Sequence, residues 1–240
     1  MKILRRATDA LLSLLFPPHC ATCGADTPAR RHLCDGCLEK AARIEAPFCR
    51  QCSQPFDGAI DGQFTCSNCE GRGFHFDCAV SRYRSTGLVR ELMHRFKYGR
   101  CLYLSLPLVE WLDETLDDER IRAQSFDGLV PVPLHAARRR EREFNQADVL
   151  ARLLAKRRGV RVIHALVRIR YTTTQTRLDR EERMQNLRNA FRVRHSRDMS
   201  GRHLILVDDV FTTGSTVDEC ARVLKEAGAA SVRVVTVARG

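Results

Sequence analysis

The stretch Leu204-Ile205-Leu206-Val207-Asp208-Asp209-Val210-Phe211-Thr212-Thr213-Gly214-Ser215-Thr216 decides the fold of this chain. Four apolar β-forming residues lead into two carboxylates, and a turn of small hydroxyl residues and one glycine follows. The next apolar residues recur at helical spacing and stop at Gly228: Val217, Cys220, Val223, Leu224 and Ala227. The pattern predicts a strand, an acidic edge, an anion-binding loop and a helix, in that order.

The residue types in this stretch indicate what it binds. Hydroxyl residues and Gly214 let backbone N–H groups close around a phosphate at a helix N-terminus, where the dipole also favours an anion. Asp208 and Asp209 would repel that phosphate, so we expect them to bind hydroxyl groups or Mg²⁺. A ligand with a phosphate, vicinal hydroxyls and bound Mg²⁺ is a phosphorylated sugar. The alternative is an ordinary buried strand followed by a capped helix.

The same stretch resembles the signature of type I phosphoribosyltransferases, which bind 5-phosphoribosyl-1-pyrophosphate (PRPP). The resemblance implies that Asp208 and Asp209 contact the ribose hydroxyls. It places the 5′-phosphate against Thr212, Thr213, Gly214, Ser215 and Thr216. Neither G-x-G-x-x-G nor G-x-x-x-x-G-K-[ST] occurs in the chain, which removes the usual competing nucleotide loops. In the purine-salvage members of this superfamily, an aspartate that acts as a general base occupies the position of Thr212. This chain has threonine there, so its sequence does not indicate a nucleobase substrate.

Eight of the 11 cysteines fall into four C-x-x-C pairs in the first third of the chain. The pairs are Cys20/Cys23, Cys34/Cys37, Cys49/Cys52 and Cys66/Cys69. Two such pairs make a tetrahedral Cys₄ zinc site, so we predict two structural zinc ions. Sequential pairing closes the shortest loops, and interleaved pairing is the alternative. Disulfides would need an oxidising compartment, and no export signal with a cleavage site precedes the cysteines.

The rest of the chain predicts a globular protein with two parts. Apolar residues make up 44% and charged residues 29% of the sequence. The apolar run at residues 3–16 is too short to span a bilayer, so we expect an amphipathic helix, no transmembrane segment and a cytoplasmic location. We predict this helix and a double zinc-ribbon module over residues 1–76. Over 77–240 we predict a phosphoribosyltransferase-like α/β domain: a parallel sheet flanked by helices, with residues 166–169 as one strand and ligands at the carboxyl ends.

Two further segments resemble the ComF family, also called GntX-like. One comprises Val130-Pro131-Val132-Pro133-Leu134-His135, Arg138, Arg142 and Phe144-Asn145-Gln146-Ala147. The other comprises Thr172, Gln175, Thr176, Leu178, Arg183, Asn186 and Ala190-Phe191. With Phe96-Lys97-Tyr98 and the cysteine module, the resemblance covers essentially the whole chain. It suggests these pyrophosphate or loop ligands: Lys97, Arg138, Arg142, Asn145, Gln146, Thr172 and Gln175. Glu143 stands where the family pattern has glycine, and a positive φ there would strain it.

The charge is concentrated in one stretch. Residues 138–202 carry 19 Lys and Arg against 7 Asp and Glu, in a chain of net charge +11. A solvated face, a pyrophosphate cradle and a nucleic-acid surface are the alternatives. The candidate DNA-backbone contacts are Arg139, Arg140, Arg152, Lys156, Arg157 and Arg158. Aromatic residues are sparse in this stretch, so no platform for base stacking is predicted.

The ComF resemblance implies a role in natural competence. It suggests handling of single-stranded DNA at the inner face of the cytoplasmic membrane, with competence proteins as partners and PRPP or another ribose phosphate as ligand. The alternative is a phosphoribosyltransferase of nucleotide salvage or nucleoside metabolism, whose acceptor the sequence does not name. The intact signature loop favours a nucleotide-dependent function in either case.

Overall fold

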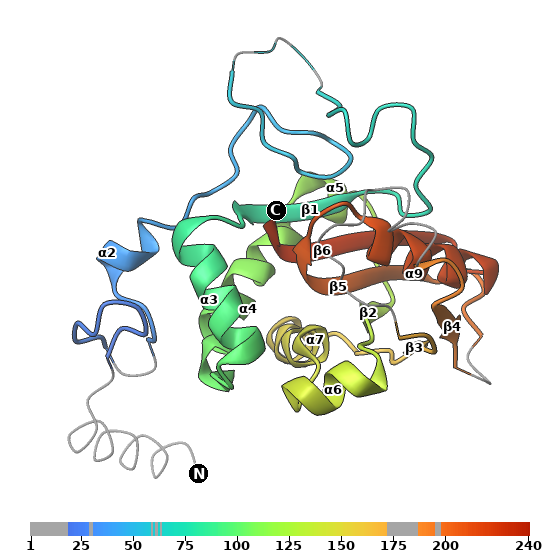
Figure 1. The fold of residues 1–240 in the computed structure, drawn as a ribbon. Coiled ribbons are helices and arrows are strands. Elements are labelled where there is room, and N and C mark those ends of the chain that lie inside the picture. Colours follow the sequence, from blue (N-terminus) through green and yellow to red (C-terminus); the bar gives the residue numbers. More distant parts are fainter. Residues whose placement is uncertain are drawn as a thin grey trace.

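A four-stranded parallel sheet forms the centre of the computed structural model, which describes residues 19–28, 31–58, 60, 62, 64–171, 187–194 and 198–240 (Figure 1). The strands run in the order β1-β6-β5-β2. Their bounds are Ala79–Arg84 for β1, Gly128–Pro131 for β2, His203–Phe211 for β5 and Ser231–Arg239 for β6. Strand β5 pairs with β6 on one side and β2 on the other, so the predicted parallel α/β sheet is confirmed.

Both faces of the sheet are covered by helices. Successive side chains of a strand point to opposite faces, so an apolar run such as that of β5 has apolar side chains to bury on each face. Leu204 and Leu206 pack in one core group, Ile205 and Val207 in the other, and all four are fully buried. The Ile205 face carries α3 (Gly87–Tyr98), α4 (Ser105–Asp113) and α7 (Gln146–Arg158). The Leu204 face carries α9 (Ser215–Glu226).

Short elements complete the described chain. They are α2 (Asp35–Leu38), η1 (Leu102–Leu104), η2 (Glu114–Asp117), α5 (Glu119–Arg122) and α6 (Ala136–Arg142). Helix α6 follows β2 directly, and Asn145 caps the N-terminus of α7 by accepting a hydrogen bond from the Ala147 N–H at 3.2 Å. Helix α6 and the start of α7 lie near the carboxyl end of β5, since residues of all three line one cavity.

The prediction for residues 166–169 was wrong in its pairing. Strand β3 (Leu166–Arg168) pairs antiparallel with β4 (Phe191–Val193) in a separate two-stranded sheet. The chain after α7 pairs with β2 at the isolated Leu129–Val162 bridge and then turns to the second sheet. A three-residue run has too little periodicity to distinguish these two pairings, and only the distant partner β4 decides between them.

The cysteine-rich segment lies against the edge of the sheet formed by β1. The Ile44 N–H donates to the Arg82 carbonyl, and the Arg84 N–H donates to the Ala42 carbonyl, both at 2.8 Å. The Ala79 N–H donates to the Gln51 carbonyl, also at 2.8 Å. Within the described part of the chain no helix is both long and apolar enough to cross a membrane.

Candidate functional site

The two aspartates lie near the carboxyl end of β5, which continues to Phe211 rather than ending at residue 207. The Asp209 N–H donates to Asp208 Oδ1 at 2.9 Å. Burial, and after it the neighbouring Asp209 carboxylate, raise the pKa of Asp208 to about 7. Lys97 from α3 places its Nζ 3.0 Å from Asp209 Oδ2, so this pair of carboxylates has a cation beside it.

The phosphate loop, which we define as residues 212–216, connects β5 to α9. Gly214 has φ of +81°, and a Cβ at this position would lie 2.6 Å from Cζ of the Phe211 ring. Both observations require glycine. The Thr213 and Ser215 hydroxyl oxygens lie 3.0 Å apart at the first turn of α9. The loop thus brings hydroxyl groups and the N-terminus of a twelve-residue helix to one point, as an anion site requires.

Helix α6 and the start of α7 form a basic wall opposite the aspartates. Arg142 donates to the Tyr98 hydroxyl at 2.9 Å and to Gln146 Oε1 at 3.2 Å. Arg142 Nε and Gln146 Nε2 are buried without a hydrogen-bond partner among the described residues. Burial lowers the pKa of Arg168 on β3, and the nearby Arg138 guanidinium lowers it further. This concentration of cations and buried donors favours an anionic ligand.

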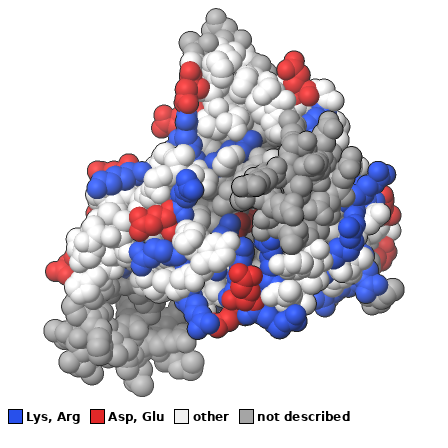
Figure 2. All heavy atoms as spheres, viewed as in Figure 1, with Lys and Arg blue, Asp and Glu red and all other residues white. Residues whose placement is uncertain are grey.

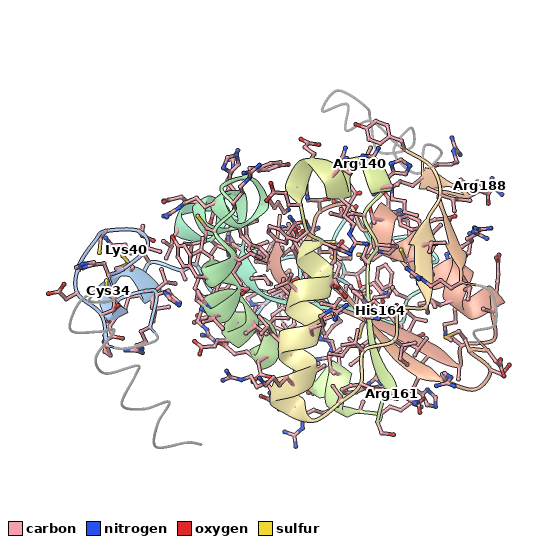
Figure 3. The ribbon with its side chains drawn as sticks, turned by 90° about the horizontal axis from the view of Figure 1, so that it is seen from below. Cys34, Lys40, Arg140, Arg161, His164 and Arg188 are labelled. Carbon is pink, nitrogen blue, oxygen red and sulfur yellow. The ribbon has the colours of Figure 1, made fainter. Side chains whose placement is uncertain are left out.

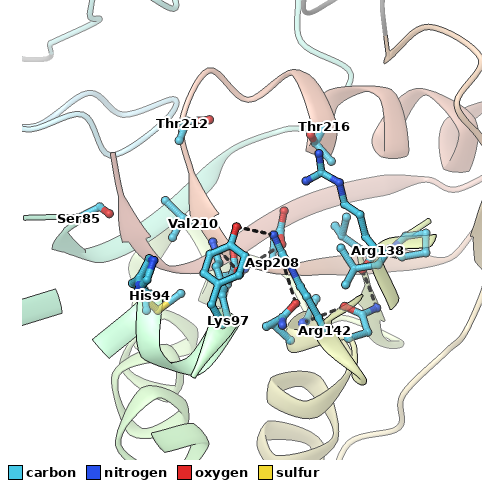
Figure 4. Close-up of a pocket in the computed structure, with 18 of the residues that line it drawn as sticks. Ser85, His94, Lys97, Arg138, Arg142, Asp208, Val210, Thr212 and Thr216 are labelled. Carbon is cyan, nitrogen blue, oxygen red and sulfur yellow. Dashed lines mark hydrogen bonds and ion pairs between the residues drawn. The ribbon is translucent and has the colours of Figure 1, made fainter. Parts of the chain in front are cut away.

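One cavity of about 440 Å³ joins these groups at the carboxyl edge of the sheet (Figure 4). Lys97 from α3, Asp208 from β5 and Thr212 from the phosphate loop line it, and Arg138 reaches in from α6. The sequence-predicted residues that line it are Lys97, Arg138, Arg142, Asn145, Gln146, Asp208, Asp209, Thr212 and Thr216. Thr213, Gly214 and Ser215 belong to the phosphate loop without lining the cavity, and Thr172 and Gln175 lie outside the described residues.

Two of these residues form hydrogen bonds with other parts of the chain, Asn145 through both its polar groups and Gln146 through its oxygen alone. Asn145 donates through Nδ2 to the Val132 carbonyl at 3.0 Å, while its Oδ1 caps α7. Gln146 accepts from Arg142 and is only 2% exposed. Asn145 therefore holds the α6–α7 corner in place, whereas Gln146 keeps an Nε2 donor without a partner among the described residues.

Glu143 adopts the strained backbone expected where the family pattern has glycine. Its φ is +68° at the end of α6, and Arg100, at the end of α3, has φ of +54°. The two side chains form an ion pair, with Arg100 Nη2 2.6 Å from Glu143 Oε1. Because both residues are exposed, this pair offsets only part of the conformational cost of two left-handed residues.

The cysteine sulfurs gather into two clusters by sequential pairing. Cluster 1 contains Cys20, Cys23, Cys34 and Cys37, and cluster 2 contains Cys49, Cys52, Cys66 and Cys69. Within each cluster the sulfur atoms lie within 4.8 Å of one another. The sulfurs of Cys23 and Cys34, and those of Cys52 and Cys66, are 3.6 Å apart. Tetrahedral zinc with bonds of about 2.3 Å needs sulfurs about 3.8 Å apart, so both clusters fit structural zinc.

Comparison with known proteins identifies both parts of the chain. Residues 11–70 match the double zinc ribbon domain, and residues 146–240 match the phosphoribosyl transferase domain. Competence protein F of Haemophilus influenzae is 30% identical over 215 residues, which cover 88% of this chain and 92% of that protein. The chain belongs to the ComF family.

A second relative covers a similar share of the chain. The DNA utilization protein YhgH of Salmonella typhimurium is 35% identical to this ComF family member over 210 residues, covering 86% of this chain and 90% of that protein. Among solved structures, the glutamine phosphoribosylpyrophosphate amidotransferase from B. subtilis aligns with a TM-score of 0.39 and 20% identity. That alignment covers 59% of this chain and 30% of the amidotransferase.

Sequence reasoning missed several residues that line the cavity of this ComF protein: Ser85, Arg90, His94, Tyr98 and Arg168. His94 and Tyr98 share a face of α3 with Lys97, and their rings lie 5.0 Å apart. Spacings of three and four residues from His94, to Lys97 and to Tyr98, were the available signal. Arg168 had no such signal, because the β3–β4 pairing brings it to the cavity.

The basic stretch is only partly available to an external ligand. Arg157 Nε lies 2.9 Å from Asp113, and Arg158 pairs with both Asp113 and Asp117. Arg152 pairs with Asp148 at 2.9 Å on α7 itself. Three of the six candidate DNA contacts thus have carboxylate partners, and the other three are Arg139, Arg140 and Lys156. Basic and acidic side chains are interspersed over the face shown in Figure 2.

Proposed function

We propose that the cavity binds PRPP or another ribose phosphate together with Mg²⁺. The observation that carries this proposal is the meeting of three groups in one cavity of about 440 Å³: the phosphate loop, the paired aspartates and the basic wall. The loop would hold the 5′-phosphate at the N-terminus of α9. Asp208 and Asp209 would accept hydrogen bonds from ribose hydroxyls, with Mg²⁺ nearby. Arg138 and Arg142 would bind the pyrophosphate.

Calorimetry of the zinc-loaded chain with PRPP, with and without Mg²⁺, tests this site. The double variant Asp208→Asn/Asp209→Asn keeps the side-chain size but removes the charge. We expect its affinity to fall more than tenfold, because a hydrogen bond to a charged group contributes about 1.5–3 kcal/mol. A matched control, Glu110→Gln/Glu226→Gln, removes two carboxylates that do not line the cavity and should bind as the wild type does. Equal affinity in both double variants would reject the assignment.

We further propose that this protein acts in competence-type DNA uptake and binds single-stranded DNA. The support comes from relatives named for competence and for DNA utilization, together with Arg139, Arg140 and Lys156 beside the cavity and on α7. Figure 3 shows that Arg140 and Arg161 lie near opposite ends of α7. We propose the inner face of the cytoplasmic membrane as the location of this role, as the family resemblance suggests.

Two exposed tyrosines, one of which lines the cavity, change the expectation for base stacking. Tyr98 is 53% exposed and lines the cavity, and Tyr171, 52% exposed, has its ring 5.2 Å from that of His135. The sequence placed few aromatic residues in the basic stretch, but α3 supplies Tyr98 from outside it. Rings beside basic side chains are what a sequence-independent single-strand site uses.

Salt-dependent binding of a fluorescent single-stranded oligonucleotide separates a DNA surface from a solvated face. Each phosphate contact contributes about −0.7 to the slope of log K against log salt, so Arg139→Glu/Arg140→Glu should reduce the slope by about 1.4. The control Arg157→Gln/Arg158→Gln changes two arginines already paired with carboxylates and should leave the slope nearly unchanged. If the α6 variant binds DNA as the wild type does and transforms normally, α6 is a solvated face.

A further inference from the structure

Arg239, the last residue of β6, lies between the phosphate loop and cluster 2. Its side chain is 6% exposed. The Nη1 atom donates to the Phe211 carbonyl at 3.3 Å, and the guanidinium carbon lies 5.1 Å from the centre of the Phe211 ring. The Nη2 atom points to the sulfur of Cys52 at 4.0 Å. One guanidinium therefore contacts both a cysteine of cluster 2 and the residue that precedes the phosphate loop.

Phe211 packs directly against the phosphate loop. Its ring lies directly under Gly214, where a Cβ would come within 2.6 Å of it. The ring of Phe76 packs edge-on against it, with centroids 5.9 Å apart. The neighbouring His75 N–H donates to Asp218 Oδ1 in the first turn of α9 at 2.6 Å. A shift of Phe211 would consequently move the loop and the start of α9.

Cluster 2 offers Arg239 a counter-charge. Among the described residues no Asp or Glu side chain forms an ion pair with Arg239; its Nη1 also donates to the oxygen of Gly240, and its Nε is buried without a hydrogen-bond partner. A buried cation is costly unless an opposite charge compensates it. Four thiolates around one Zn²⁺ carry a net negative charge, and the N–H groups of arginine can donate to such sulfurs.

Cluster 1 offers the natural comparison. Cys20 and Cys37 pack in the core group that contains α3 and α4, whereas the four cysteines of cluster 2 pack with Phe76 and Phe211. Arg95 donates to the Ala21 backbone carbonyl beside cluster 1, and this contact does not reach the phosphate loop. The two clusters have the same ligands but different neighbours.

We propose that Arg239 is a positioning residue that couples zinc binding at cluster 2, and not at cluster 1, to the geometry of the phosphate loop. The inference rests on the proposed phosphate-binding function for its ligand, but the coupling itself resides in the chain. Coupling between two binding sites is reciprocal. If zinc at cluster 2 strengthens ligand binding at the loop by a given factor, the ligand must strengthen zinc binding at cluster 2 by that same factor.

Zinc release from the full chain to an excess of chromophoric chelator tests the coupling. Cys34→Ser and Cys66→Ser, each expected to retain one zinc, assign the two release phases to the clusters. Saturating ribose 5-phosphate should slow release from cluster 2 on the order of fivefold or more and leave cluster 1 unchanged. Arg239→Met should abolish this slowing, and Arg239→Lys, which keeps the charge but not the planar fork, should retain part of it. Equal slowing at both clusters, or unchanged slowing in Arg239→Met, would overturn the proposal.

A second measurement separates this proposal from the ribose-phosphate assignment. If calorimetry shows no binding of ribose 5-phosphate, the proposed ligand is wrong, and hydrogen exchange of residues 211–219 without ligand then decides the coupling. We expect exchange at the first turn of α9 to quicken at least about fivefold in Cys66→Ser and in zinc-loaded Arg239→Met, but not in Cys34→Ser. The same exchange in all three variants as in the wild type would show that no coupling exists.

Discussion

Gly214→Ala is the substitution whose effect the structure specifies most closely. The alanine would have to adopt a φ of +81°, and its Cβ would lie 2.6 Å from the Phe211 ring. The left-handed backbone costs an L-residue about 1–2 kcal/mol. Overpacking against a buried ring costs about 1–3 kcal/mol more, for a total of about 2–5 kcal/mol.

This cost appears in one of two quantities. If the loop keeps its geometry, the free energy of unfolding falls by the full amount. If the loop relaxes, restoring it on binding weakens the affinity for ribose 5-phosphate, by about thirtyfold for 2 kcal/mol. Urea unfolding measures the loss of stability, and calorimetry on the same samples measures the loss of binding free energy. We expect the two losses to add up to the total of about 2–5 kcal/mol.

Gly159→Ala is the matched control, because Gly159 also has a positive φ, +68°, but a Cβ there would meet nothing within 4 Å. It should lose only the backbone part, about 1–2 kcal/mol, with unchanged ligand affinity. Adding Phe211→Leu to Gly214→Ala should recover the steric part, as a coupling energy of about 1 kcal/mol or more in a double-mutant cycle. The reasoning is refuted if Gly214→Ala costs no more than Gly159→Ala.

Three further predictions concern other parts of the chain. The pKa of Asp208 is raised to about 7 in the folded protein. Its protonated carboxyl therefore stabilises the fold fully only when the pH is below the pKa that the group has in the unfolded chain, and this contribution is lost as the pH rises through 7. Urea unfolding should therefore show Asp208→Asn gaining stability over the wild type between pH 5.5 and 8, and a pH-independent difference would contradict this. Glu143→Gly should raise the free energy of unfolding by about 0.5–1 kcal/mol, because it removes a left-handed non-glycine residue and only an exposed ion pair; a loss of stability in thermal or urea unfolding would show that the ion pair with Arg100 dominates. Elemental analysis should find two zinc ions per chain, and chelation should lower the melting temperature, whereas disulfides in their place would refute the zinc assignment.

Much of the site could be predicted because its signals are local. The apolar run before Asp208 predicts a strand, and the Thr-Thr-Gly-Ser turn predicts a loop at a helix N-terminus. Each C-x-x-C pair predicts a knuckle, because the spacing alone brings its two sulfurs together. Even the strained backbone of Glu143 was predictable, since a glycine position in the family pattern marks a positive φ.

The sequence by itself therefore determined the signature loop on its strand and the four cysteine knuckles, because each depends on residues within one turn or one strand. It also determined the net positive charge, which is a sum over the composition and needs no fold. The tertiary structure decided which knuckles share a metal site, that Lys97 meets Asp209, and that Arg157 and Arg158 face carboxylates on α4 and η2. It also moved residues 166–168 out of the parallel sheet and put Arg239 between Cys52 and Phe211. These contacts join residues far apart in the chain, and no local preference encodes them. They form only when both sheet faces and the β1 edge are packed, so the partner of each charge is set by the fold.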